Sequence, residues 1–311
     1  MKQKSIIMVV KKMIEIKNVT KQFERDVVLN SVDMTIQKGS IYGLLGSNGA
    51  GKTTLLKIIA GIIQQNNGDI LIENQAVYEN IGLKNRMVFI PDALYFFSQY
   101  TVQQMASFYR NFYSSWNESR FQQMKELLDL DVNGKIHRFS KGMQRQVAFW
   151  LALCAMPDYL ILDEPFDGLD PVIRKKIKTW IIQDVADREM TVVISSHNLR
   201  EVEDICDAIG ILHRGKLMLE KDLDDLKTDI HKVQLAFRDE EPEGIFKDLH
   251  VMHTEKRGSV SLYIIKGEYE DIEQMVDQYQ PVVFDILPLT LEEIFVYEME
   301  GAGYAIENIL L

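Results

Sequence analysis

One eight-residue segment limits what this chain can fold into more than any other feature. Residues 46–53 read Gly-Ser-Asn-Gly-Ala-Gly-Lys-Thr and match the phosphate-binding pattern G-x-x-x-x-G-K-[ST]. An apolar run at Ile41–Leu45 predicts a buried strand before it, and an apolar stripe predicts a helix over residues 54–63 after it. The stripe consists of Leu55, Leu56, Ile58, Ile59 and Ile62. A strand, a glycine-rich loop and a helix in this order predict an α/β fold with a site for a nucleoside triphosphate.

The residue types in this loop suit the binding of phosphate. Glycines allow the tight turn that points successive backbone N–H groups at phosphate oxygens. Lys52 adds a positive charge near the β- and γ-phosphates, and the Thr53 hydroxyl can coordinate Mg²⁺. We therefore expect the following residues of this segment to bind ATP: Gly46, Ser47, Asn48, Gly49, Ala50, Gly51, Lys52, Thr53 and Thr54.

The distribution of charge divides the chain into two parts. A length of 311 residues suggests about two domains. Residues 221–311 carry 8 Lys and Arg against 21 Asp and Glu, whereas residues 1–220 carry 27 against 25. We expect a domain boundary near residue 221. The acidic second domain is a poor match for nucleic-acid phosphates or an anionic membrane surface.

The remaining composition favours a soluble protein of a reducing compartment. The two cysteines, Cys154 and Cys206, form neither a disulfide framework nor a metal-binding pattern, which fits the cytoplasm. The longest apolar run, Val147–Met156, has about half the length needed to cross a bilayer as a helix. Near the N-terminus, Ser5–Val10 is shorter than the apolar core of a secretory signal. We expect any membrane-spanning part to belong to another subunit.

Hydrophobic patterns outline the rest of the first part. Alternating residues within 13–37 predict two antiparallel strands, and residues 1–12 are predicted to be a tail. Asn66–Gly68 is predicted to be a turn that closes the first helix. Further predicted strands, separated by helical stretches, lie at Met87–Ile90, Tyr159–Leu162 and Thr191–Ser195. This alternation predicts a largely parallel sheet.

The second part predicts a small α+β domain without a recognisable catalytic cluster. Its predicted strands are Val233–Phe237, Ser259–Lys266 and Pro281–Leu287, and its predicted helices are Tyr269–Tyr279 and Thr290–Met299. Two interpretations remain open for this domain. It is either a regulatory or dimer-stabilising appendage, or a structural one.

Aromatic residues gather in one short stretch. Residues 95–121 hold ten of the 29 aromatics. Thr101 and Gln104 form a predicted capping box, and helical spacing continues over Val102, Met105, Tyr109, Phe112 and Trp116. These aromatics form either the core of a small helical subdomain or a groove for a partner's helix.

Four later segments narrow the function. Phe139–Gln144 precedes a predicted helix, and the predicted strand Tyr159–Leu162 ends in Asp163 and Glu164. Gly168-Leu169-Asp170 follows, and His197 ends the strand that begins at Thr191. Asp163 and Glu164 lie at the end of a predicted sheet strand beside the loop. There Asp163 can hold Mg²⁺, and Glu164 can orient or deprotonate the attacking water. His197 can donate a hydrogen bond to the γ-phosphate, whereas His213, next to a predicted turn, is expected at the surface.

In this order and spacing, residues 13 to about 220 resemble the ATP-binding cassette (ABC) ATPases. The resemblance implies a P-loop NTPase cassette with an N-terminal antiparallel β-subdomain and a helical subdomain at about 92–157. The α+β domain predicted from the patterns at 221–311 would be an accessory or regulatory addition to this cassette. It identifies residues 46–53 as Walker A, residues 160–164 as Walker B and His197 as the switch histidine. The Ser-Lys-Gly-Met signature and the acidic extension are similar to ATPases of bacterial ABC-2-type exporters of drugs, bacitracin-like antibiotics or peptides.

The resemblance also implies a composite site between two subunits. The signature residues Ser140, Lys141, Gly142 and Met143 would contact the ATP of the opposite subunit, and the D-loop would contain Asp170. Phe23 falls where the family stacks an aromatic ring on adenine, although packing within its strand is the alternative. Asp92 replaces a common glutamine and can still contact Mg²⁺ or water. Lys141, Met143 and Asp167 are further departures from the family pattern.

These features predict a dimeric Mg-dependent ATPase that energises a separate integral membrane permease, most simply an exporter. The dimer would be a homodimer or a heterodimer with a second ABC ATPase, located at the inner face of the cell membrane. The alternative is a soluble ABC ATPase that acts on nucleic acid or ribosomes, against which stand the single cassette and the lack of a basic tail. A P-loop kinase leaves the signature segment unexplained.

Overall fold

The chain contains two compact units. The structure, a computed structural model, describes residues 12–238, 242 and 244–301. The chain divides between Glu220 and Lys221, where the charge balance of the sequence also changes. The predicted N-terminal tail lies outside the described residues except for Lys12, with which strand β1 begins. Each unit is described by itself below.

A six-stranded sheet forms the centre of the first unit, in the order β10-β9-β3-β8-β7-β6. The five strands from β9 to β6 pair in parallel. β3, β7 and β8 are buried throughout, because helices cover parallel sheets on both faces. The strands are β3 (Ile41–Leu45), β6 (Met87–Ile90), β7 (Tyr159–Asp163), β8 (Thr191–Ser196), β9 (Ala208–His213) and β10 (Lys216–Asp222). The predicted parallel sheet is thus confirmed.

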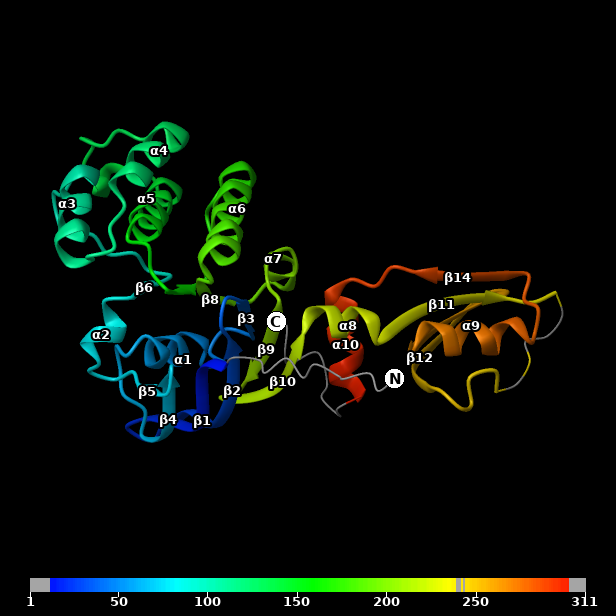
Figure 1. The fold of residues 1–311 in the computed structure, drawn as a ribbon. Helices are drawn as coiled ribbons and strands as arrows, with labels where there is room; N and C mark the ends of the chain where they lie inside the picture. Colours follow the sequence, from blue (N-terminus) through cyan, green and yellow to red (C-terminus); the bar gives the residue numbers. More distant parts are fainter. Residues whose placement is uncertain (1–11, 239–241, 243, 302–311) are drawn as a thin grey trace, which may run out of the picture. The chain divides into compact units, whose positions relative to one another are not determined.

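A second, antiparallel sheet has the order β2-β1-β4-β5. Its strands are β1 (Lys12–Phe23), β2 (Asp26–Gln37), β4 (Asn67–Ile72) and β5 (Gln75–Ala76). Alternate residues of β2, such as Val32 and Met34, are buried against helix α1 (Lys52–Ile59), which shares one core with both sheets (Figure 1). The N-terminal antiparallel β-subdomain is therefore confirmed.

Helix α1 is shorter than predicted. It ends at Ile59, and Ile62 is 52% exposed instead of belonging to the buried stripe. The cause is Gly61, which adopts a left-handed conformation at φ 63. The N–H groups of Gly61 and Ile62 donate to the carbonyls of Ile58 and Lys57, which is the hydrogen-bond pattern of a Schellman motif. The turn predicted over residues 66–68 is also wrong, because β4 already begins at Asn67.

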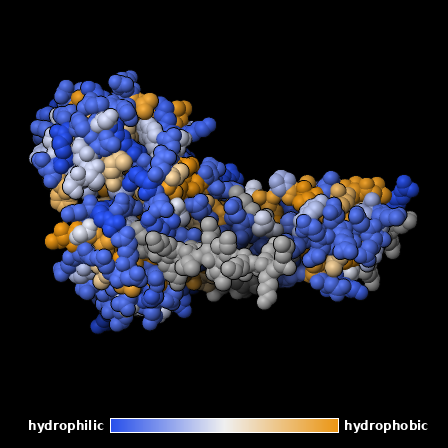
Figure 2. Space-filling model, in the orientation of Figure 1, coloured by the Kyte–Doolittle hydropathy of each residue, from blue (hydrophilic) through white to orange (hydrophobic). Residues whose placement is uncertain are grey.

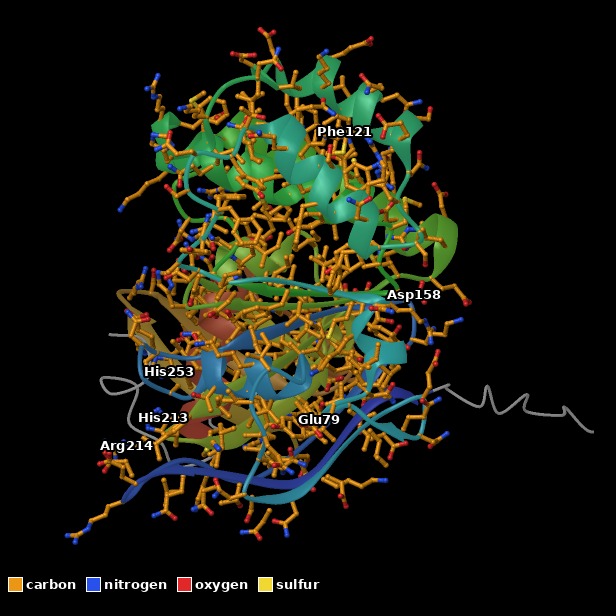
Figure 3. All side chains as sticks on the ribbon, turned by 90° about the vertical axis from the view of Figure 1, so that its left-hand side faces the viewer. Glu79, Phe121, Asp158, His213, Arg214 and His253 are labelled. Atoms are coloured by element: carbon orange, nitrogen blue, oxygen red, sulfur yellow. The ribbon has the colours of Figure 1, made fainter. Side chains whose placement is uncertain are left out.

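A helical subdomain lies between β6 and β7. It contains α3 (Val102–Phe112), α4 (Glu118–Leu128), a short 3₁₀ helix (Ile136–Arg138) and α5 (Lys141–Cys154), while α2 (Ile81–Lys84) precedes β6. The predicted capping box at the start of α3 is confirmed. Phe121 of α4 stacks on Trp150 of α5 with ring centroids 4.7 Å apart, and it lies among the helices (Figure 3). This subdomain therefore has a core of its own.

Two further helices complete the first unit. α6 (Pro171–Arg188) follows β7, and α7 (Leu199–Glu203) follows β8. Among the described residues, no helix is both long and apolar enough to cross a membrane. Hydrophilic side chains cover most of the face seen in Figure 2, with hydrophobic ones in separate groups.

The second unit is built on a four-stranded antiparallel sheet in the order β12-β13-β11-β14. Its strands are β11 (Ile230–Ala236), β12 (His250–Arg257), β13 (Val260–Lys266) and β14 (Val283–Leu287). Its helices are α8 (Leu223–Thr228), α9 (Tyr269–Asp277) and α10 (Leu291–Gly301). Val233 of β11, Ile265 of β13 and Val276 of α9 belong to one buried core. The predicted α+β architecture is correct, but β12 and α8 were not predicted.

Candidate active site

The loop after β3 has a backbone that only glycine allows at its first position. Gly46 has φ 155, and a Cβ there would lie 2.2 Å from the carbonyl oxygen of Leu212. At the other end, Gly51 precedes α1 and supplies no side-chain cap. The first N–H groups of α1 therefore remain available for an anion, and the helix dipole favours negative charge there.

Lys52 lies inside this loop. Its ammonium group donates to the carbonyl oxygens of Gly46 at 2.6 Å and Ser47 at 3.3 Å. It also forms an ion pair with Glu164, with Nζ 3.2 Å from Oε1. The side chain is only 6% exposed, so its charge acts in a site that excludes most water.

Two hydroxyl groups hold the Asp163 carboxylate at the end of β7. The Thr53 hydroxyl donates to one carboxylate oxygen at 2.8 Å, and the Ser195 hydroxyl donates to the other at 2.6 Å. The Ser195 oxygen also accepts the backbone N–H of Glu164 at 3.0 Å. Thr53 and Asp163 together present hard oxygen ligands of the kind that Mg²⁺ prefers. Ser195 was predicted only as a strand residue, because nothing in its sequence context distinguishes it.

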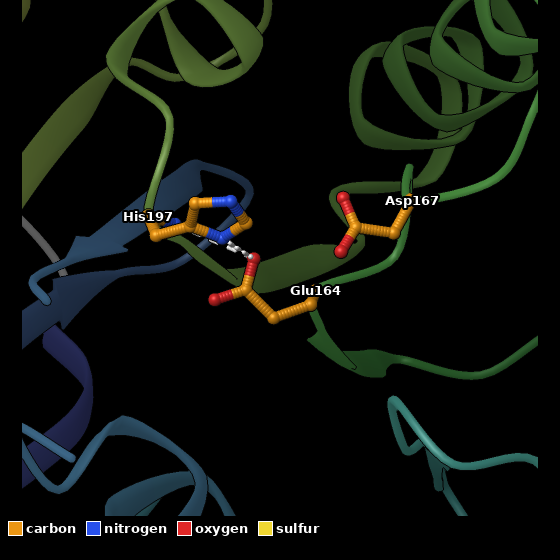
Figure 4. A group of neighbouring side chains, drawn as sticks. All are labelled: Glu164, Asp167 and His197. Carbon is orange, nitrogen blue, oxygen red and sulfur yellow. Dashed lines mark hydrogen bonds and ion pairs between the residues drawn. The ribbon is translucent and has the colours of Figure 1, made fainter. Parts of the chain in front are cut away.

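Glu164 is held between Lys52 and His197. Its second carboxylate oxygen lies 2.9 Å from Nδ1 of His197 and accepts that residue's backbone N–H at 3.3 Å (Figure 4). Its backbone is left-handed, at φ 45, which is rare for a residue with a side chain. Asp167 contributes a further carboxylate. Glu164, Asp167 and His197 each offer one oxygen or nitrogen atom that could bind a metal ion, and these three atoms lie within 4.8 Å of one another. The carboxyl ends of β3, β7 and β8 thus bring the predicted catalytic groups together.

The signature segment lies at the start of α5. Ser140 is the N-cap of this helix, and its hydroxyl accepts the N–H of Met143 at 3.2 Å. Lys141 is exposed, whereas a Cβ on Gly142 would lie 2.8 Å from the carbonyl oxygen of Gly168. These contacts explain why a lysine is accepted at position 141 while position 142 keeps its glycine.

The D-loop is hydrogen-bonded to helix α6, while the signature segment is not hydrogen-bonded to the P-loop through its Ser140 or Lys141 side chains in the described residues. Asp170 caps α6 by accepting the N–H groups of Val172 and Ile173, both at 3.1 Å. Within the described part of the chain, no side-chain hydrogen bond or ion pair connects Ser140 or Lys141 with the loop of residues 46–53.

Asp92 follows β6 and contacts an arginine that sequence reasoning missed. Its carboxylate lies 3.2 Å from Nη2 of Arg145, which also donates to the Asp92 carbonyl at 3.0 Å. The other terminal nitrogen of Arg145 donates to the carbonyl of Glu164 at 2.9 Å. The only sequence signal for Arg145 was its place as the last charged residue before the apolar run at 147–156.

Phe23 and His213, two further residues discussed from the sequence, differ in how exposed they are. Phe23 is 46% exposed at the end of β1, and the Lys21 ammonium lies 4.9 Å from its ring centroid. His213, expected at the surface, is half-buried (Figure 3). Burial lowers its pKa, and the neighbouring positive charge of Arg214 adds to this effect.

Comparison with known proteins decides the family. The ABC transporter family matches residues 29–167. The ABC transporter ATP-binding protein YtrB of Bacillus subtilis is 30% identical over 289 residues, which are 93% of this chain and 99% of YtrB. The chain belongs to the ABC transporter ATP-binding proteins. This ABC protein is also 28% identical to the bacitracin transport ATP-binding protein BcrA of Bacillus licheniformis over 284 residues, 89% of this chain and 92% of BcrA.

A solved structure confirms the fold of the cassette. The dimeric post-hydrolysis state of the ATP-binding cassette MJ0796, bound to ADP and Pi, matches with a TM-score of 0.62 and 22% identity. The match covers 68% of this ABC protein and 99% of that chain. This ABC protein therefore contains the fold of an ABC ATPase cassette.

Proposed function

We propose that this ABC protein is a Mg-dependent ATPase that drives a transporter, working as a dimer on a separate membrane permease. One observation carries the proposal: the Glu164 carboxylate stands at the end of β7 beside the phosphate-binding loop, contacted by both Lys52 and His197. A carboxylate in this place can orient the attacking water and accept its proton.

The residues around Glu164 supply the remaining requirements of phosphoryl transfer. The N–H groups at the start of α1 and the Lys52 ammonium would bind the phosphates of ATP and hold the γ-phosphate in line with the water. His197 would donate a hydrogen bond to the γ-phosphate as charge develops on it. Thr53 and Asp163 would hold Mg²⁺, which neutralises charge on the phosphate oxygens when bound.

Hydrolysis by purified protein tests this assignment. We expect Glu164→Gln to keep ATP binding but to lower kcat by at least about a hundredfold, because the amide is a far weaker base. The same variant should accumulate as an ATP-bound dimer, detectable by light scattering. Glu126→Gln, an exposed carboxylate of α4, is the matched control and should retain normal kcat. Normal turnover by Glu164→Gln would remove Glu164 from this role.

The dimer proposal rests on the position of the signature segment. Ser140 and the first N–H groups of α5 form a second helix N-terminus, and in the described residues neither Ser140 nor Lys141 has a side-chain hydrogen bond or ion pair with the P-loop of its own chain. A head-to-tail second copy, or a related ATPase, would bring such a segment to the ATP bound by this chain. Each of two ATP molecules would then lie between a P-loop and the signature segment of the opposite subunit.

A patch of exposed aromatic side chains is the proposed permease contact. Phe108 and Phe112 on α3 are 41% and 57% exposed, and Phe97 lies 5.2 Å from Phe108 between ring centroids. Such rings are favoured anchors for a partner's helix. Phe121, in contrast, is fully buried, so the aromatic stretch serves the subdomain core and the surface at once.

Co-purification tests the permease contact. The double variant Phe108→Ser and Phe112→Ser should lose its co-purification with an integral membrane protein from detergent extracts, while ATP hydrolysis persists. Ile81→Ser, at another strongly exposed apolar site, is the control and should keep its co-purification.

By similarity to BcrA, we propose that the transporter exports antibiotics, drugs or peptides.

A further inference from the structure

Arg145 joins three segments that are far apart in the sequence. It lies on α5, five residues after the signature Ser140, and donates to the main chain after β7 and after β6. Its side chain is only 9% exposed. An arginine buried this deeply normally has partners for its charge and its N–H groups. Here those partners are two carbonyl oxygens and the Asp92 carboxylate.

The first of these partners is the peptide that aims the predicted catalytic carboxylate. Glu164 has a left-handed backbone, and a conformation of this kind persists only when its surroundings impose it. Two side chains do so: Ser195 accepts the Glu164 N–H, and Arg145 donates to the Glu164 carbonyl. The carboxylate that this peptide carries contacts Lys52 and His197. Loss of the Arg145 bond therefore removes the side-chain restraint on the carbonyl side of Glu164 and leaves only the one on its N–H side.

The second partner explains a departure from the family pattern. The Asp92 side chain is 59% exposed, and its carboxylate and its own carbonyl both accept from Nη2 of Arg145. The negative charge at this position is therefore directed at α5. A neutral amide at position 92 would offer Arg145 no ion pair.

We propose that Arg145 is a positioning residue for Glu164, with Asp92 as its anchor. The inference rests on the proposed ATPase function. The guanidinium group fixes the Glu164 peptide to α5, the helix whose first turn contains the signature segment. A displacement of that helix therefore changes the aim of the catalytic carboxylate directly, and the ion pair with Asp92 holds the arginine at the correct place.

Steady-state ATP hydrolysis by the purified full chain tests the proposal. We expect Arg145→Gln to lower kcat by on the order of tenfold to a hundredfold, with KM for ATP changed by less than about threefold. Asp92→Asn removes the ion pair but keeps the carbonyl contact, so its kcat should fall by only about threefold. The double variant should match Arg145→Gln alone, because the anchor has no role without the arginine.

Arg188→Gln is the matched control, because Arg188 also joins a carbonyl, that of Pro157, to a carboxylate, that of Asp184, away from the site. It should lower stability while kcat stays within about twofold. Normal kcat in Arg145→Gln, or an equal loss in Arg188→Gln, overturns the proposal. If Arg145→Gln does not fold, normal kcat in Asp92→Asn overturns it instead. Absence of hydrolysis by the unsubstituted protein removes the proposed function as well, whereas the other outcomes leave that function standing.

Discussion

Ser195 shows how much of this site depends on a side chain that takes no part in the proposed chemistry. Its hydroxyl donates to the Asp163 carboxylate and accepts the N–H of Glu164. One small group therefore orients both the proposed metal ligand and the backbone of the proposed base. Side chains that hold such ligands commonly matter almost as much as the ligands themselves.

We predict that Ser195→Ala lowers kcat for ATP hydrolysis by about tenfold to a hundredfold. The alanine leaves the part-buried N–H of Glu164 without its acceptor and removes the hydrogen bond to one oxygen of Asp163. Thr191→Val, at the other end of the same strand, is the control because its hydroxyl accepts the N–H of Gly39, away from Asp163 and Glu164. That variant should lose stability with kcat nearly unchanged. Equal kcat in the two variants would contradict the role of Ser195.

For the candidate site, the spacing of the motifs predicted which side chains would lie near one another, while their catalytic roles stay proposals. Lys52 and Thr53 follow the loop after β3, Asp163 and Glu164 lie at the end of β7, and His197 follows β8, and parallel strands bring their carboxyl ends to one edge of a sheet. Ser195 and Arg145 were not predictable, because a serine in a strand and an arginine in a helix are ordinary. Their importance arises only from the tertiary contacts that they make.

Among the elements, periodicity located the strands and helices better than their ends. The strand Met87–Ile90 was predicted with its observed bounds, since it is short, apolar and buried in the parallel sheet. β12 was missed because it is an edge strand with several charged residues, a composition that protects edges from unwanted pairing. The end of α1 depends on the left-handed Gly61, which a pattern of apolar residues does not show.

The cap of α3 permits a quantitative prediction for one element. Thr101→Ala should lower the free energy of unfolding of the first unit by about 1 kcal/mol, because the N–H of Gln104 loses its acceptor. Ser107→Ala is the control within the same helix, where the hydroxyl donates to the Gln103 carbonyl of the preceding turn and does not cap the helix. Its stability should change by no more than about 0.5 kcal/mol. Urea denaturation followed by circular dichroism measures both, and an equal loss would contradict the capping role.

At the scale of the whole molecule, the two units differ in their cysteine content, which thiol modification can detect. Both cysteines of the chain lie in the first unit and are buried. Burial raises the pKa of Cys154 to about 12, and burial also raises the pKa of Cys206 well above its usual range. Since the thiolate is the reactive form, both thiols should be protected in the folded protein.

We predict that iodoacetamide at pH 8 modifies native Cys154 and Cys206 at least about a thousandfold more slowly than the unfolded chain. In rising urea, modification should begin only when the first unit unfolds. Val276→Cys places a comparable thiol in the core of the second unit, so its modification reports on that unit separately. Fast modification of either native cysteine in the absence of urea would show that the first unit opens far more readily than its packing implies.

The contact of Gly142 with the Gly168 carbonyl has a consequence for any assembly of two copies. The backbone at Gly142 faces the backbone carbonyl of Gly168, so no side chain could change rotamer to make room for a larger residue. The signature segment and the D-loop therefore lie close together within one chain, before any second copy binds. Even a single methyl group at position 142 would press on the Gly168 carbonyl and shift one of these two segments against the other.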